Sequence, residues 1–161
     1  MVVSNNIVNL ILRIVSEIDY KDIVFVGGIT DYYHFNKLKI QYDGEINDID
    51  IAIFNINTLN QIENVLNVKA NLVYSCEYYN QYYIRINNIV IDIFHCNINE
   101  SYEIESVNFY GKLINIWSID YRLAVLKRTL IKDLHERPKN RVIFKYLKKM
   151  MLYTKKINVC V

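Results

Sequence analysis

The chain opens with an apolar stripe at helical spacing and continues with short apolar runs. In residues 5–18 the apolar side chains recur every three or four positions, which predicts an amphipathic helix packed on the core. Residues 23–26 form a β-branched and aromatic run that Gly27-Gly28 stops. This pattern is typical of a buried strand that enters a tight turn.

Two further helices and one irregular segment are predicted in the first half of the chain. Residues 29–35 have room for a short helix with Thr30 or Asp31 near its start. The apolar spacing at 59–66 predicts a longer helix. Between them, residues 36–47 have no clear period, so we expect a mobile loop or a small hairpin beside the functional site.

Isoleucines alternate with Asp48, Asp50 and Ala52 along residues 48–53. In a strand, side chains alternate between the two faces, so the three isoleucines would share one face. Asp48 and Asp50 would then point together from the other face. The isoleucines fix the strand on the core and leave two carboxylates on the opposite side.

Three later apolar runs predict successive strands at 72–74, 82–86 and 89–94. Asn87-Asn88 separates the last two runs and predicts a hairpin turn, so we expect this region to be antiparallel.

The strand at 89–94 repeats the arrangement around Asp50. Its isoleucines share one face, and Asp92 lies among apolar neighbours on the other. An unpaired carboxylate in such surroundings costs several kcal/mol, so it needs a cation, a hydrogen-bonding partner or solvent. Asp92 is therefore the candidate third carboxylate.

The C-terminal part is predicted to be helical. Residues 97–112 are acidic and show no regular pattern, whereas leucines at helical spacing follow Trp117. A second helix is predicted after Pro138, which suits a first turn. Lys127 falls within the apolar stripe of the first of these helices, so its ammonium group either reaches the rim of the core or binds an anionic ligand.

Composition and length place the chain among ordinary globular proteins. It has 161 residues, of which 52% are hydrophobic and 22% charged. We expect a core over residues 1–112 and a helical segment over 113–161 that packs on it, as a single compact unit. The N-terminal apolar stripe is interrupted by polar residues, so neither a signal peptide nor a membrane span is predicted.

Charge and cysteine usage narrow the choice of partner and compartment. Between Arg122 and Lys156 there are twelve Lys and Arg residues and only two acidic ones. This asymmetry favours a surface that faces a polyanion, although a solvated helix face is the common alternative. The three cysteines are widely spaced and form no CxxC pair, so we expect no disulfide framework or zinc site and a reducing, cytoplasmic location.

The candidate chemistry is metal-assisted phosphoryl transfer. Three carboxylates on adjacent strands can hold two Mg²⁺ ions roughly 3.5–4 Å apart, with Mn²⁺ as the alternative metal. Gly27-Gly28 would let backbone N–H groups approach phosphate oxygens, helped by the N-terminus of the following helix. An Asp-x-Asp pair alone more often marks a solvated strand end, but the order of these features is more specific. The three histidines are dispersed along the chain and provide no competing site.

This combination resembles the nucleotidyltransferase superfamily of the DNA polymerase β type. The matching segments are Val26-Gly27-Gly28, Asp48-Ile49-Asp50-Ile51 and Asp92. The stretch Gly27-Gly28-Ile29-Thr30-Asp31 also resembles tRNA nucleotidyltransferases, with Thr30 where an arginine is usual. Leu123-Ala124-Val125-Leu126-Lys127 is similar to the helical segment of small stand-alone nucleotidyltransferase-like proteins.

The resemblance implies an α/β fold of the α+β kind, with a mixed or antiparallel sheet flanked by helices and a basic helical segment at the C-terminus. By the same resemblance, Asp48, Asp50 and Asp92 would be the catalytic and metal-binding residues. Gly27, Gly28 and Lys127 would hold the nucleoside triphosphate.

Two functions follow as hypotheses. The first is a Mg²⁺-dependent nucleotidyltransferase that uses an NTP, such as ATP, to modify a hydroxyl group and releases pyrophosphate. Its acceptor is an RNA 3′ end, a protein or a small molecule, with the basic C-terminal helices available to bind RNA or protein. The second is a protein of the same fold that does not catalyse and docks on nucleic acid or an acidic partner.

Overall fold

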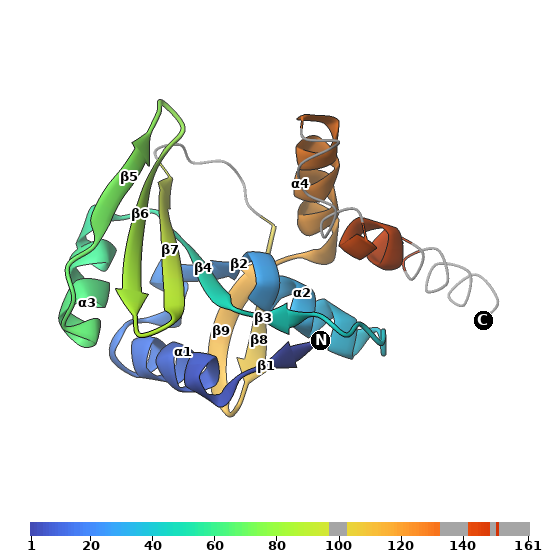
Figure 1. Ribbon diagram of the computed structural model, residues 1–161, viewed down its shortest axis with the longest axis horizontal. Coiled ribbons are helices and arrows are strands. Elements are labelled where there is room, and N and C mark those ends of the chain that lie inside the picture. Colours follow the sequence, from blue (N-terminus) through green and yellow to red (C-terminus); the bar gives the residue numbers. More distant parts are fainter. Residues whose placement is uncertain (97–102, 133–141, 149–150, 152–161) are drawn as a thin grey trace.

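A seven-stranded mixed sheet forms the centre of the protein. The computed structural model describes residues 1–96, 103–132, 142–148 and 151. The strands are β2 (Ile23–Val26), β4 (Asp48–Ile53), β5 (Asn71–Ser75), β6 (Tyr79–Ile86), β7 (Ile89–Cys96), β8 (Ile104–Phe109) and β9 (Lys112–Trp117). Their order across the sheet is β5-β6-β7-β4-β2-β9-β8 (Figure 1). Two neighbouring pairs, β4 with β7 and β2 with β9, are parallel, and the other pairs are antiparallel.

Helices flank this sheet, as the resemblance implies. They are α1 (Asn5–Glu17), a short 3-10 helix η1 (Tyr20–Asp22), α2 (Gly27–Lys37), α3 (Ile56–Leu66) and α4 (Ile119–Lys132), and residues 142–148 are also helical. In Figure 1, α1 and α3 lie below and beside the sheet, whereas α4 rises above it. None of the described helices is long and apolar enough to cross a membrane.

The main core lies between one face of the sheet and the helices α1 and α3. The isoleucines of β4 are completely buried there, as their alternation along the strand predicts. The apolar positions of α1 and α3 cover them, with Ile11 and Ile62 fully buried. Because one face of β4 is committed to this core, its aspartates project from the opposite face.

A second, smaller core joins α2 to the C-terminal helices. Its buried members are Phe35 of α2, Leu126 of α4, and Ile143 and Leu147 of the helical residues 142–148. The packing of the C-terminal segment against α2 brings two parts of the chain together that lie about a hundred residues apart. The division into units at residues 112 and 113 stays a prediction, but β9 crosses that position and extends the sheet to Trp117.

Two segments differ from the sequence-based expectation. The stretch read as irregular over 97–112 contains β8, which forms a hairpin with β9 across Tyr110-Gly111. Val107 and Phe109 are its buried positions, and polar residues between them hide the alternation in an acidic context. Residues 97–102 and Pro138 lie outside the described residues.

The segment 36–47 is the other difference. It forms no hairpin of its own: α2 extends to Lys37, and β3 (Glu45–Ile46) pairs in parallel with β1 (Val2–Val3) at the N-terminus. The pairing ties the segment that precedes Asp48 to the start of the chain.

Candidate active site

The register of three adjacent strands lines up the predicted site. In β2 and β4, Val26 pairs with Asp50, and in β4 and β7, Asp50 pairs with Asp92. Asp48 lies two positions before Asp50 on the same face and pairs with Val90. The structure therefore brings the end of the Gly-Gly strand and all three predicted carboxylates to one region of the sheet.

Asp50 lies at the centre of this arrangement. Burial, followed by the negative charges of Asp48 and Asp92, raises the pKa of its carboxyl group to about 7. The Arg122 guanidinium and a hydrogen bond from the backbone N–H of Gly28 act in the opposite direction. Two neighbouring carboxylates thus oppose the charge on Asp50, which is the electrostatic setting that a cation would relieve.

Gly27 fits against Asp50 in a way that requires glycine. Its φ is +56°, and a Cβ atom at this position would overlap Oδ2 of Asp50 and lie 2.8 Å from its Cγ. The helix α2 begins at Gly27, and the N-cap residue Val26 supplies no side-chain hydrogen bond to its first turn. Thr30 secures the turn instead by donating a hydrogen bond from Oγ1 to the carbonyl of Phe25 at 2.9 Å. Thr30 and Asp31 are therefore not capping residues.

Asp92 has a partner on the neighbouring strand. Gln81 of β6 donates a hydrogen bond from Nε2 to Oδ1 of Asp92 at 3.0 Å. Tyr83 is the residue of β6 that pairs directly with Asp92. The amide of Gln81 holds the third carboxylate on the side of the site away from Gly27.

A buried ion pair connects α2 to α4 next to the carboxylates. Nε and one terminal nitrogen of Arg122 donate to the two carboxylate oxygens of Asp31, each at 2.7 Å. Both side chains are almost inaccessible, at 9% and 2% exposure. Burial lowers the pKa of Arg122, but the charges of Asp31 and Asp50 outweigh it and raise the pKa, so the guanidinium stays charged. This pair fixes the first helix of the C-terminal segment on the helix that starts at the Gly-Gly turn.

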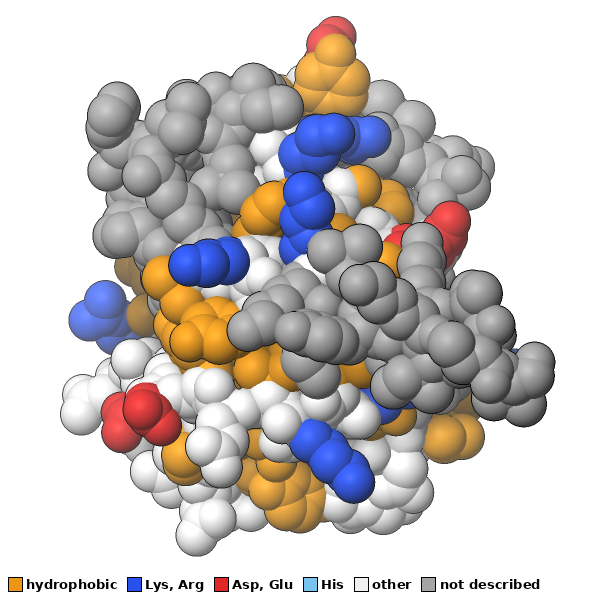
Figure 2. Space-filling model, turned by 90° about the vertical axis from the view of Figure 1, so that its right-hand side faces the viewer, with side chains coloured by type: hydrophobic (Ala, Val, Ile, Leu, Met, Phe, Trp, Pro, Cys, Tyr) orange, Lys and Arg blue, Asp and Glu red, His pale blue; other side chains and the backbone are white. Residues whose placement is uncertain are grey.

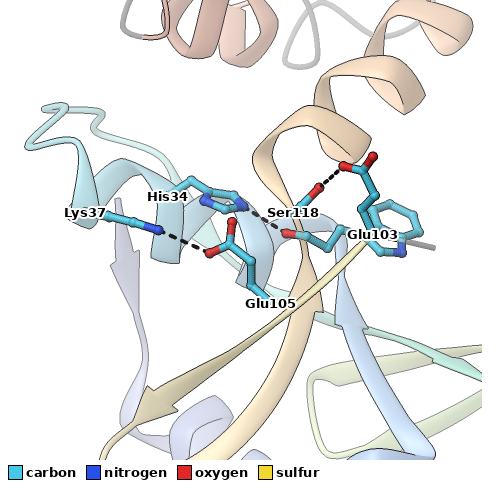
Figure 3. A network of polar contacts seen from close by, with 6 residues as sticks. His34, Lys37, Glu103, Glu105 and Ser118 are labelled. Atoms are coloured by element: carbon cyan, nitrogen blue, oxygen red, sulfur yellow. Dashed lines mark hydrogen bonds and ion pairs between the residues drawn. The ribbon is translucent and has the colours of Figure 1, made fainter. Parts of the chain in front are cut away.

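Polar contacts on the next turn of α2 extend this connection (Figure 3). His34 donates from Nε2 to the carbonyl of Trp117 at 2.9 Å, and Lys37 forms an ion pair with Glu105 of β8 at 3.2 Å. Ser118 contacts Glu103 through both its backbone and its hydroxyl group. Burial lowers the pKa of His34, so this histidine acts as a neutral structural donor.

Among the described residues, His95 gives no alternative site. His95 lies on the same face of β7 as the core-facing isoleucines, which is the face opposite to Asp92. His135 lies outside the described residues.

Lys127 is placed differently from its expected position in the apolar stripe. The buried face of α4 carries Arg122 and Leu126, and Lys127 is exposed beside them. Figure 2 shows the molecule from the right-hand side of Figure 1. On this side of the molecule, Lys and Arg side chains lie among hydrophobic ones. Lys127 is accessible to a ligand, and its role in binding triphosphate stays a prediction.

The donor set fits a hard divalent cation in its chemistry. Carboxylate oxygens are the ligands that Mg²⁺ prefers, and the absence of a side chain on Gly27 leaves the space that the Asp50 carboxylate occupies. Within the described residues, the side chains do not already converge as a group of three or more His, Cys, Asp or Glu ligands. Metal binding would therefore require rotation of carboxylates, including Asp92, which Gln81 holds.

The sequence reasoning missed three functional neighbours. Asp31 and Arg122 are 91 positions apart, and Gln81 lies 11 positions before Asp92. Asp31 has one local signal, its place four residues after Gly27 in the first turns of the helix. Arg122 has none, because it is one of many basic residues in its segment.

Comparisons with known proteins identify the fold through structure. No protein-family model and no curated protein sequence matches the chain. The antibiotic-resistance factor ANT(2'')-Ia in solution aligns with a TM-score of 0.65 at 14% identity, over 94% of this chain and 87% of that protein. Its crystal structure with adenylyl-2''-tobramycin gives a TM-score of 0.62 at 12% identity, over 96% and 94% of the two chains.

A second enzyme gives a similar alignment. The lincosamide antibiotic adenylyltransferase LnuA, bound to lincomycin, aligns with a TM-score of 0.56 at 15% identity, over 92% of this chain and 98% of that protein. At sequence identities this low, the structural alignments establish the fold alone. The chain therefore has the nucleotidyltransferase fold that its motifs predict.

Proposed function

We propose that the protein is a metal-dependent nucleotidyltransferase that moves a nucleoside monophosphate from an NTP to a hydroxyl group. The observation that carries this proposal is the row formed by the Gly-Gly turn, Asp50 and Asp92 across three paired strands. A non-catalytic binding module has no need of a partly buried carboxylate whose charge two neighbouring carboxylates oppose.

The carboxylates would hold the metal. Asp48, Asp50 and Asp92 would bind two Mg²⁺ ions, or Mn²⁺ in their place. When bound, these ions lower the pKa of the acceptor hydroxyl and neutralise charge on the triphosphate. The carboxylates come from two adjacent parallel strands, β4 and β7, so the pairing of these strands determines where the negative charge lies.

The nucleotide would bind at the N-terminus of α2. The first-turn N–H groups of α2 carry partial positive charge, which favours phosphate oxygens, and Gly27 and Gly28 begin this helix without side chains. Lys127 on α4 would add an ammonium group to the triphosphate. The Asp31–Arg122 pair holds α2 and α4 together, so it positions both contributions.

Transfer would then proceed by direct displacement. The acceptor oxygen attacks the α-phosphorus and forms a P–O bond, while the bond from that phosphorus to the oxygen shared with the β-phosphate breaks. Pyrophosphate leaves with the electron pair of that bond, and the hydroxyl proton passes to Asp92 or to water. The products are the nucleotidylated acceptor and pyrophosphate.

A small hydroxylated molecule is the acceptor that the similar proteins favour. ANT(2'')-Ia is described with adenylyl-2''-tobramycin and LnuA with lincomycin, and both align over nearly their whole lengths. An RNA 3′ end or a protein is the alternative, supported by the exposed Lys127, Arg128, Lys145 and Lys148.

The test is transfer of label from each α-³²P-labelled NTP, with Mg²⁺ or Mn²⁺, to tobramycin, lincomycin, total RNA or lysate protein. We expect a labelled product that depends on the metal and is lost in Asp50→Asn. The absence of transfer to every acceptor, together with no thermal shift by any NTP, would refute the enzyme. A well-folded protein that binds RNA but transfers no label would instead support the non-catalytic protein that docks on nucleic acid.

A further inference from the structure

A row of aromatic rings extends from the third carboxylate to the edge of the sheet. Phe94 of β7 contacts Tyr79 of β6, with ring centroids 5.8 Å apart. Tyr79 contacts Tyr74 of β5, with centroids 5.6 Å apart. These three residues, called the aromatic row below, cross the three strands β7, β6 and β5.

The aromatic row lies on the same face as the carboxylates. Phe94 is two positions after Asp92 and therefore projects from the same face of β7. Gln81, two positions after Tyr79, donates its hydrogen bond to Asp92, which places the side chains of β6 on that face as well. The base of the row is fixed, because Phe94 packs on the apolar patch of Val26 and Ala52 beside Asp50.

An irregularity in β5 brings the last ring to this face. The register shifts between Leu72 and Tyr74, so that Leu72 pairs with Tyr82 while Tyr74 pairs with Gln81. Without the extra residue, Leu72 and Tyr74 would share a face. The bulge instead turns Tyr74 toward the carboxylates and leaves Leu72 on the core side, a use of bulges that is common next to functional sites.

The strand order places the aromatic row on the acceptor side of the site. The Gly-Gly turn follows β2, which is the neighbour of β4 on one side, whereas β7, β6 and β5 lie on the other side. A triphosphate at the start of α2 would therefore extend away from the row. The molecule whose hydroxyl group attacks would then approach Asp92 from the side of the row.

We propose that the aromatic row binds the acceptor, and that the acceptor is a small molecule that presents the apolar face of a ring next to its reactive hydroxyl. The proposal rests on the nucleotidyltransferase function proposed above and specifies its substrate. Stacking fits the composition of the strands: β5, β6 and β7 contain one acidic residue, Asp92. A polycation held by several ion pairs has few partners on these strands, whereas Tyr74, 51% exposed, offers a ring face at the outer end.

The experiment compares three variants at the edge strand. Tyr74→Ala removes the outer ring, and Tyr74→Phe keeps the ring without the hydroxyl group. Leu72→Ala is the matched control, because Leu72 is on the same strand, 57% exposed, and faces the other side. Lincomycin and tobramycin serve as acceptor probes, with separate measurement of the KM for ATP and the KM for each acceptor.

We expect Tyr74→Ala to raise the acceptor KM roughly 3- to 10-fold, the equivalent of one lost aromatic contact, and to leave the ATP KM unchanged. Tyr74→Phe and Leu72→Ala should behave like the parent protein. Lincomycin binding should change little between low and high salt, because stacking is not screened as ion pairs are. An equal effect of Leu72→Ala, or a rise in the ATP KM instead of the acceptor KM, would overturn the assignment.

A binding measurement separates this proposal from the enzymatic one. Saturation-transfer NMR detects lincomycin and tobramycin on the protein without turnover. If no transfer occurs but lincomycin binds and Tyr74→Ala weakens its binding, the aromatic row is a ring-binding site and only the enzymatic function fails. If neither probe binds the parent protein, the proposal for the aromatic row is wrong, even where transfer to RNA is observed.

Discussion

The Asp50 carboxylate and a side chain on residue 27 would need the same space, so residue 27 must be glycine. The Asp50 carboxylate occupies the position that a Cβ atom of residue 27 would take. The contact arises because Val26 pairs with Asp50, so the first residue of the turn passes over the carboxylate. The Gly-Gly motif thus serves the carboxylate as directly as it serves a phosphate.

Gly27→Ala should therefore lose activity and stability together. The positive φ alone costs about 1–2 kcal/mol for a residue with a side chain, and displacement of Asp50 adds to it. We expect a lower free energy of unfolding in urea and no nucleotidyl transfer. Gly111→Ala is the control, because Gly111 also has a positive φ but an added Cβ has no atom within 4 Å. If both variants lose the same stability and both keep transfer, the contact with Asp50 is unimportant.

The stability of the metal-free protein should fall as the pH rises from about 4 to about 7. The folded protein keeps a proton on Asp50 up to a pKa of about 7, whereas the unfolded chain loses it near the ordinary aspartate pKa of 3.8. In this window the native state binds more protons, so stability is full below the lower value and is lost as the pH passes the upper one. The loss is of the order of a few kcal/mol.

Urea unfolding in EDTA across this pH range measures the effect. Asp50→Asn should remove this decline and be more stable than the parent protein at pH 8, and Asp48→Asn should reduce the decline by removing one repulsive charge. Addition of Mg²⁺ at pH 8 should stabilise the parent protein but not Asp50→Asn. An Asp50→Asn protein that is unfolded at every pH would make Asp50 a structural residue.

Local patterns predict the parts of the site that depend on strand periodicity. Ile49 to Ile53 establish which face of β4 is buried, and the same alternation identifies Asp92 on β7 as a neighbour of Asp50. The sequence cannot place Arg122, because its partner Asp31 is distant in the chain and only the packing of α4 on α2 brings them together. Similarly, one extra residue in β5 decides the face of Tyr74, and an alternation rule cannot detect it.

The division expected after residue 112 stays a prediction, but nothing in the local pattern indicated that β9 crosses this position. β8 and β9 join the sheet beside β2, although they follow β7 in the chain. Strand order is a property of long-range pairing, so an acidic segment with a weak apolar alternation gave no indication of it. Lys127 shows the same limit on a smaller scale: the helical spacing is right, but the orientation of α4 is fixed by Arg122 and Leu126.

Removal of one partner of the Asp31–Arg122 pair should destabilise the protein strongly, whereas replacement of both by apolar residues should destabilise it little. Arg122→Met leaves the Asp31 carboxylate buried without its partner, which should lower the free energy of unfolding by about 3–5 kcal/mol. The double variant Asp31→Leu with Arg122→Met should recover most of this loss. A double-mutant cycle by urea unfolding gives the coupling energy.

The exposed pair Lys37–Glu105 is the comparison for that cycle. Its side chains are 54% and 30% exposed, so Lys37→Ala should cost no more than about 1 kcal/mol. If the Arg122 and Lys37 variants prove equally mild, the buried pair does not hold α4 on α2.

Lys127→Ala should weaken nucleotide binding without affecting the metal or the fold. An ammonium group that donates to a triphosphate contributes a charged hydrogen bond, so its loss should raise the ATP KM roughly 10- to 100-fold. Because Lys127 is exposed, the free energy of unfolding should remain within about 0.5 kcal/mol of the parent value. Steady-state transfer assays measure the ATP KM, calorimetric titration measures Mg²⁺ binding, and urea unfolding measures the stability.

Arg128→Ala is the matched control, because Arg128 is the next residue of α4 and is also exposed. If the basic segment binds anions only through its overall charge, loss of either side chain should raise the ATP KM by a similar factor. This effect should become smaller at high salt in both variants. A specific triphosphate ligand raises the ATP KM only in Lys127→Ala, since neighbouring positions on a helix point about 100° apart. Equal effects would remove Lys127 from the site and leave the start of α2 as the proposed anchor of the nucleotide.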